Sequence, residues 1–470
     1  MGRFPRLRFQ VGDLGPIHGV FVSHAHSDHL DPYTLVRLWR ELDSPPVLLL
    51  PVTLSFLVPL FREHLPDCDI CVIGAHMPVT FRGVDLFGFY DIGPAPTNED
   101  DVMVLVVRSG AETALVEADA NLSLDHPEFR EFITMLMAEP GIESAVFLTT
   151  ENELTGTLFS KDCPDRDARD ALADMAMNEM LSSVQALYAP VDDPQDLWHH
   201  PHILRLVHGQ GLTAPHELDP RWHHILFPVG VEDRVREERA SAARAGFHHQ
   251  IDSLTVGSVH TITDGRIEAV VPLPGLKMLD HDEQRRFDPE LVFFPDLPCA
   301  PLRFDTRDVG SQRARILALL NHRFLPYLHG GRQPSVLHLL AGYGGVYRVR
   351  VHYGITVDGE AWDYVLGFDA RDFVEQPSSE EDEPHETYWA NDLDDFLDGL
   401  CDEFSTFCRT QFPEQDIRLW ACLATPLLNS DLVEKRVRHH FERARAGLTP
   451  GAYVMGLFEA GLHGAAAPLS

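Results

Sequence analysis

Three histidines and two aspartates lie close together near the N-terminus, in the segment VFVSHAHSDHLD at residues 20–31. Four of them, His24, His26, Asp28 and His29, have the spacing H-x-H-x-D-H directly after a short apolar run. In an extended backbone His24 and His26 point to the same side, while Asp28 and His29 turn toward a neighbouring position. Imidazole and carboxylate groups bind transition metals such as zinc and iron. The spacing therefore predicts one half of a dinuclear metal site; a chance surface cluster is the alternative in a chain with 26 histidines.

The segments around this loop predict the elements that position it. Residues 17–23 (IHGVFVS) have the composition of a strand, and residues 33–42 (YTLVRLWREL) have the apolar spacing of an amphipathic helix. Residues 44–61 predict a buried strand followed by a helix. Further strands are expected over residues 84–93, 102–110, 113–121, 143–152, 184–193 and 254–270. Strands that alternate with helices indicate a layered α/β domain, which we place at residues 1–285.

A proline-rich connection at residues 293–304 (FFPDLPCAPLRF) precedes a second pattern. Residues 346–357 and 362–373 alternate as a hairpin, and residues 375–386 (EQPSSEEDEPHE) are expected to form a solvated acidic spacer. Helices are expected over residues 311–328, 392–409 and 429–447. This predicts a smaller α+β domain at residues 286–470.

The charge of the chain limits its partners. It has 72 acidic and 38 basic side chains among 470 residues, which gives a formal net charge of -34. Such a field repels phosphate backbones and anionic lipid surfaces, so we expect neither a nucleic-acid nor a membrane partner. Seven cysteines show no disulfide framework, and the first residues lack the apolar core of a secretory signal. We therefore expect a cytoplasmic protein.

The H-x-H-x-D-H motif after a core strand resembles the signature of the metallo-β-lactamase-fold superfamily. The segment SHAHSDHLDPYTL is most similar to the branch that contains L-ascorbate-6-phosphate lactonase and the metallo-β-lactamase domain of CMP-N-acetylneuraminate hydroxylase. The resemblance implies an αββα sandwich with its metals at one sheet edge. Members usually place one or two strands before the motif, where this chain has about twenty residues. We expect the C-terminal domain, or a neighbouring subunit in a homo-oligomer, to cover that edge.

The resemblance also implies ligands at three later strand ends. The bridging aspartate matches Asp119 in LVEADAN. Where members carry a third histidine for the first metal, LFGFYDIGPA has Asp91, and His76 lies upstream. Where members carry a last histidine in Pro-x-His, YAPVDD has Asp192. Rival ligands for that last position follow it closely: His199, His200 and His202.

Carboxylates in place of histidines favour iron over zinc, because they are harder ligands and stabilise higher oxidation states. Hydroxylases of antibiotic biosynthesis in this superfamily are similar in replacing a first-site histidine with an acid. We therefore expect a nonheme diiron monooxygenase that hydroxylates a small organic substrate with electrons from an external donor. The alternative is a dizinc hydrolase of an ester, lactone or phosphoester, in which Asp28 or Asp119 orients the attacking water. A metal-binding protein without catalysis is the third interpretation.

Overall fold

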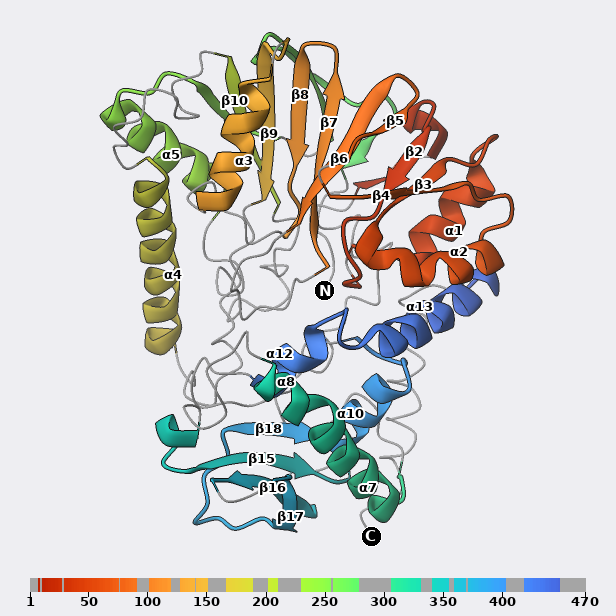
Figure 1. The fold of residues 1–470 in the computed structure, drawn as a ribbon, viewed down its shortest axis with the longest axis vertical. Helices are drawn as coiled ribbons and strands as arrows, with labels where there is room; N and C mark the ends of the chain where they lie inside the picture. The colour runs from red at the N-terminus through yellow and green to blue at the C-terminus, as the bar shows by residue number, and fades with distance from the viewer. Residues whose placement is uncertain are drawn as a thin grey trace.

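The computed structural model describes residues 7–8, 11–27, 29–75, 77–90, 101–119, 127–139, 141–150, 166–188, 202–209, 230–254, 257–278, 306–330, 340–354, 359–368, 371–402 and 418–448. Within these residues two sheets face each other, and helices cover their outer faces (Figure 1). No helix among them is long and apolar enough to cross a bilayer.

The first sheet is a parallel one with the strand order β2-β3-β4. Its strands are β2 (Gly19–Phe21), β3 (Val47–Pro51) and β4 (Ile70–Ile73), and its helices are α1 (Pro32–Glu41) and α2 (Val58–His64). The apolar run VLLLP of β3 packs on both sides of the sheet. Leu48 and Leu50 pack toward the helices, whereas Leu49 between them packs toward the second sheet. The strand is thus buried on both faces.

The second sheet has seven strands in the order β11-β10-β9-β8-β7-β6-β5. They are β5 (Val79–Phe81), β6 (Val84–Tyr90), β7 (Met103–Ser109), β8 (Glu112–Val116), β9 (Ser144–Thr150), β10 (Ile203–His208) and β11 (Gln250–Ser253). Neighbours from β5 to β8 are antiparallel, and those from β8 to β11 are parallel. In β7, Val104 and Val106 face the outer helices, while Met103 and Leu105 face the first sheet. The outer helices are α3 (Pro127–Met137), α4 (Arg166–Leu187) and α5 (Val231–Ala245).

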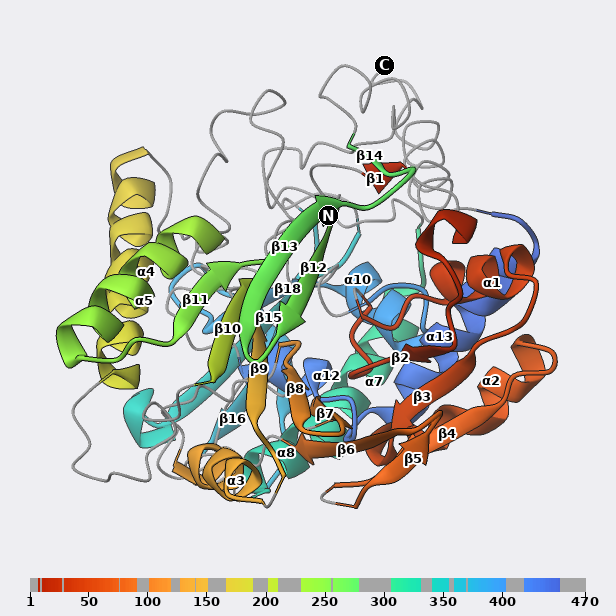
Figure 2. The same cartoon turned by 90° about the horizontal axis from the view of Figure 1, so that it is seen from above.

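These layers confirm the expected α/β class and αββα order. A hairpin of β12 (Ser258–Thr263) and β13 (Arg266–Pro272) lies against the sheet (Figure 2). Its turn residues Asp264 and Gly265 both have positive φ, which is typical of a two-residue hairpin turn. A short pair, β1 (Leu7–Arg8) and β14 (Lys277–Met278), joins the two ends of this region.

One expected strand, over residues 184–193, is wrong in its described part. Residues up to Leu187 are the end of helix α4. Met180, Val184 and Leu187 recur with helical spacing and are buried against the seven-stranded sheet. A short apolar run alone does not distinguish a strand from a buried helix.

The C-terminal part has a four-stranded sheet with the order β17-β16-β15-β18, covered by helices on one side (Figure 1). The expected hairpin is confirmed by the antiparallel pairing of β15 with β16. The strands are β15 (Val346–His352), β16 (Ala361–Gly367), β17 (Val374–Pro377) and β18 (Glu386–Trp389). The helices are α7 (Val309–Leu319), which a π turn (Leu320–Phe324) joins to α8 (Leu325–His329), together with α10 (Ala390–Leu397) and α12 (Arg418–Ala424).

The expected acidic spacer is only partly a loop. Its first residues form β17. Its last residue, Glu386, is the first residue of β18 and is fully buried. Glu386 is retained there because Tyr347, Tyr388 and the backbone of α12 donate hydrogen bonds to its carboxylate. A charged sequence can therefore be buried where donors surround it.

The last described helix, α13 (Ser430–Arg445), packs on the first sheet's helices rather than on the C-terminal sheet alone. Val433, Val437, Phe441 and Ala444 form one stripe of its surface and join the core beneath α1 and α2. The division of the chain at residue 285 stays a prediction, because this helix contributes to the N-terminal core.

Candidate metal centre

The histidine loop connects the end of β2 to the start of α1 and is fixed at both ends. Asp31 caps α1 by accepting hydrogen bonds from the backbone N–H groups of Tyr33 (3.0 Å) and Thr34 (3.2 Å). In the middle of the loop, Ala25 N–H donates to the fully buried Asp101 carboxylate at 2.7 Å. Asp101 precedes β7, so the second sheet holds the loop.

Two loop histidines and one aspartate converge at this place. His24, His29 and Asp119 each offer one ligand atom, and the three atoms lie within 4.8 Å of one another. The His29 Nε2 atom lies 2.7 Å from Oδ2 of Asp119, and the His24 Nε2 atom lies 3.9 Å from the same oxygen. Two imidazole nitrogens and a carboxylate oxygen at such separations suit one zinc or iron ion.

The environment of His24 is the strongest indication of a cation-binding site. The side chain is fully buried, and its Nδ1 atom lies 3.0 Å from the Ser23 hydroxyl. Its Nε2 atom is buried and has no hydrogen-bond partner among the described residues. Burial, with smaller contributions from His26 and His29, holds the pKa of His24 well below its usual value. The ring is therefore neutral, which is the form that binds a metal.

Asp119 reaches the loop through an uncommon backbone conformation. It follows β8 and has φ of +50°, in the left-handed region that side chains other than glycine seldom adopt. Aspartate tolerates this region better than most residues. Strained backbone of this kind is frequent at functional positions.

The histidine loop lies at one edge of the two sheets. Helices and sheets follow the order αββα, and the H-x-H-x-D-H segment lies between the first strand of one sheet and its first helix, facing an aspartate that follows a strand of the other. This αββα order, with the motif at one edge of the sheets, is what the resemblance to the metallo-β-lactamase-fold superfamily implies.

No family model and no curated protein matches the sequence. Among solved structures, the chain is similar to CmlA, a diiron β-hydroxylase from Streptomyces venezuelae, at 13% identity and a TM-score of 0.31 over 51% of this chain and 44% of that one. The metallo-β-lactamase fold protein YhfI from Bacillus subtilis has 13% identity and a TM-score of 0.28 over 51% and 75% of the two chains. Unliganded yeast PDE1 has 14% identity and a TM-score of 0.29 over 51% and 67%. The chain thus spans less than half the length of CmlA.

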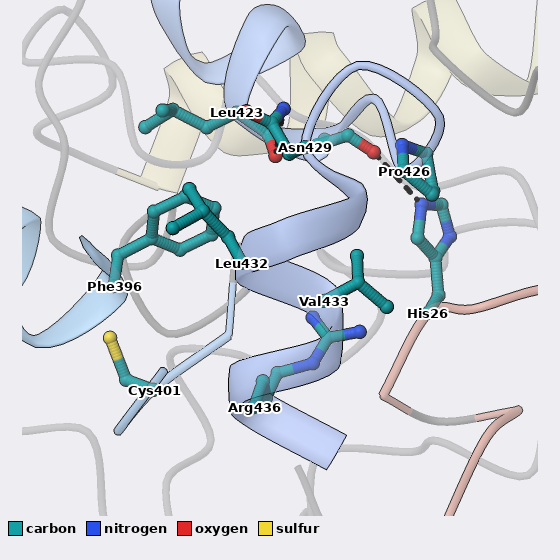
Figure 3. Close-up of a pocket in the computed structure, with 10 residues that line it drawn as sticks. His26, Phe396, Cys401, Leu423, Pro426, Asn429, Leu432, Val433 and Arg436 are labelled. Atoms are coloured by element: carbon teal, nitrogen blue, oxygen red, sulfur yellow. Dashed lines mark hydrogen bonds between the residues drawn. The ribbon is translucent and has the colours of Figure 1, made fainter. Parts of the chain in front are cut away.

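Within this αββα sandwich, His26 lies beside the three converging residues rather than among them. Its ring contacts the His24 ring edge to face, with centroids 4.7 Å apart. Its Nε2 atom lies 3.3 Å from the carbonyl oxygen of Ala424, and Figure 3 shows the ring turned toward the C-terminal residues near Pro426. A direct role of His26 as a ligand stays a prediction.

The other expected ligands fall in two groups. Asp28, Asp91 and Asp192, and the rivals His199 and His200, lie outside the described residues, as does His76. His202 is described and precedes β10, at the end of that strand opposite to His208. The predicted roles of these residues are untested.

His208 was not predicted as a site residue, although the structure brings it to the same edge. It ends β10, and its Nε2 atom lies 3.1 Å from the Glu117 carbonyl oxygen. Burial lowers the pKa of His208 and His29 lowers it further, whereas the Glu117 carbonyl and Asp119 raise it. The signal in the sequence was a histidine directly after ILRLV, a strand-like segment that is apolar except for Arg205. Because the strand before the last ligand was expected at residues 184–193, the sequence pointed to Asp192 instead.

Proposed function

We propose that the chain is a metal-dependent enzyme whose centre includes His24, His29 and Asp119. The observation that carries this proposal is the convergence of their ligand atoms within 4.8 Å, together with the buried Nε2 atom of His24, which has no hydrogen-bond partner in the described part of the chain. A metal ion bound there would supply Lewis acidity or redox chemistry.

The protein's own groups prepare this centre. Ser23 and burial orient the His24 ring, and the left-handed backbone at Asp119 directs its carboxylate to the loop. His208 has a defined tautomer, because a carbonyl oxygen only accepts and the Nε2 atom must therefore carry the hydrogen. In the neutral ring Nδ1 then has a free lone pair, which can bind a metal or accept a proton.

As the reaction we propose hydroxylation of a small organic substrate at two irons. Its support is the sequence: Asp91 and Asp192 stand where the resembled superfamily has histidines, and carboxylates favour iron. One substrate C–H bond and one dioxygen molecule give a hydroxyl group and one water, and this balance takes two electrons and two protons. A separate reductase in the cytoplasm would supply the electrons.

His208 favours a second candidate, hydrolysis at two zinc ions. Its imidazole lies close enough to Asp119 and His29 to interact with them electrostatically, whereas the expected ligands after these strands were carboxylates. Sites rich in imidazole suit zinc. Such an enzyme would cleave an ester, lactone or phosphoester, with Asp28 or Asp119 orienting the attacking water.

One experiment separates the two reactions. Protein produced without added metal is analysed for iron and zinc, and is then given dithionite or a ferredoxin reductase system while oxygen is monitored. Bound iron with electron-dependent oxygen uptake supports the monooxygenase. Bound zinc, with cleavage of aryl esters or lactones and no oxygen uptake after iron substitution, would establish the hydrolase instead.

A further inference from the structure

Three successive residues of the histidine loop are held by the C-terminal part of the chain. Arg436 donates to the Ala25 carbonyl oxygen, the His26 Nε2 atom lies 3.3 Å from the Ala424 carbonyl oxygen, and the Ser27 hydroxyl donates to Asp402 at 2.7 Å. The partners are separated by 375 to 411 positions in sequence. The loop is therefore positioned from two sides, by Asp101 of the second sheet and by the C-terminal residues.

Arg436 is the principal contact. Its side chain is only 5% exposed, and it approaches the loop from α13 (Figure 3). The peptide groups on either side of Ala25 are both fixed, since its carbonyl accepts from Arg436 and its N–H donates to Asp101. Ala25 stands between His24 and His26, so these two bonds fix the backbone from which both histidines project. Hydrogen bonds to charged groups are stronger than neutral ones, which suits this role.

The backbone of α13 at Arg436 is closely packed against Gly399. Gly399 has φ of +72°, and a Cβ atom added to it would lie 2.7 Å from the Arg436 backbone nitrogen. The cavity between His26, Leu432 and Arg436 has a volume of about 10 Å³, which is room for about one water molecule. Among the described residues this cavity is too small for a substrate. The contact between the loop and the C-terminal part therefore has a structural role.

The Ala424 carbonyl also defines the tautomer of the neutral His26 ring. A carbonyl oxygen accepts only, so the Nε2 atom carries the hydrogen, and Nδ1 of the neutral ring keeps its lone pair. Metal-binding histidines commonly donate their other ring N–H to a backbone carbonyl, which fixes the tautomer and the ring orientation. The contact thus prepares His26 as a ligand through Nδ1.

We propose that the C-terminal segment completes the metal centre. Arg436, Ala424 and Asp402 act as positioning groups for the loop, so metal binding and docking of α12 and α13 are coupled. This inference rests on the proposed metal centre.

The first test compares metal affinity among variants of the full chain. Arg436→Met removes the donor to Ala25, and Arg436→Lys keeps the charge with a shorter reach. Lys435→Met is the control, because this exposed side chain on α13 donates to the Leu397 carbonyl oxygen within the C-terminal part of the chain. Metal-free proteins are titrated with Co²⁺, whose visible spectrum reports ligand geometry.

We expect Arg436→Met to weaken Co²⁺ binding roughly 10- to 100-fold and to change the spectrum, with partial recovery in Arg436→Lys. Lys435→Met should bind as the wild type does. Wild-type affinity and spectrum in Arg436→Met would overturn the inference. Ser27→Ala decides the matter if Arg436→Met does not fold: it removes one hydroxyl, and binding should weaken about 2- to 10-fold. An unchanged affinity there would also contradict the inference.

The second test uses the reciprocity of coupled equilibria. If docking favours metal binding, metal must favour docking to the same extent. Hydrogen exchange of α13 amides should therefore slow when Co²⁺ is added to wild-type protein, and the difference should shrink in Arg436→Met. A wild type that binds no metal would refute the proposed function itself. A wild type that binds metal with the same α13 exchange in both states would refute only the coupling.

Discussion

The His29 Nε2 atom lies 2.7 Å from Oδ2 of Asp119, although the two residues follow strands of different sheets. The sandwich brings these strand ends together, and the buried ring of His24 lies beside them with its centroid 4.2 Å from that of His29. A dinuclear interpretation, a mononuclear one and a merely structural ion pair make different predictions for single substitutions.

His29→Ala should remove the bound metal and leave the fold intact. The side chain is 24% exposed, so its loss creates little cavity, yet it provides one of three converging ligand atoms. Metal content and thermal unfolding of the metal-free protein are the measurements. His18→Ala, at an exposed histidine before β2, is the control and should keep its metal. Equal metal content in both variants would exclude His29 as a ligand.

His208→Ala should weaken metal binding less than His29→Ala does. The ring is electrostatically coupled to Asp119 and His29, but it lies outside the group of three converging ligand atoms. We expect a two-phase metal titration of the wild type to lose its weaker phase in this variant. If both phases persist with unchanged midpoints, His208 only supports the Glu117 carbonyl.

The backbone at Asp119 predicts a difference between two substitutions in metal-free protein. Asparagine tolerates positive φ about as well as aspartate, whereas alanine does not, so Asp119→Ala should be less stable than Asp119→Asn by about 1 kcal/mol. Urea denaturation in the presence of a chelator measures this difference. Equal midpoints would show that the left-handed conformation is not maintained.

Acid should destabilise the fold partly through His249. Burial, with a smaller contribution from Arg205, lowers the pKa of His249 from 6.5 to about 4, and its Nε2 atom lies 3.3 Å from the Tyr188 hydroxyl. Between these pH values the unfolded chain binds a proton that the folded chain does not, so the free energy of unfolding falls as the pH is lowered through this window, by on the order of 3 kcal/mol. His249→Phe keeps an aromatic ring and should show a shallower decline between pH 6.5 and 4. The same slope in both proteins would assign the acid sensitivity to other groups.

Local patterns predicted much of the site. The H-x-H-x-D-H spacing identified the loop, and LVEADAN placed Asp119 after a strand, because both signals depend on residues that are close in sequence. His208 was missed because the short apolar segment that begins at Val184 was interpreted as a strand, although such a segment suits a buried helix equally well. The structure distinguishes the two by packing: Val184 lies on a helix against the sheet, while His208 ends a strand within it.

Contacts between distant segments could not be predicted in this way. Arg436 lies on the helix expected over residues 429–447, yet nothing in the local sequence indicates that its side chain is buried and donates to the Ala25 carbonyl oxygen. Asp394 and Asp395 are likewise buried in α10, because Arg307 pairs with both of them. Pairing partners far apart in the chain decide such burial, and no local periodicity encodes them.

The metal content of Asp119→Asn tests the central claim most directly. The substitution keeps the shape and the backbone preference of the residue but removes the negative charge that faces His24 and His29. Mass spectrometry of metals in wild-type and variant protein, purified in parallel, is the measurement. Metal bound to the wild type and largely lost from folded Asp119→Asn is the predicted result. Equal metal content in the two proteins would contradict a metal centre on His24, His29 and Asp119.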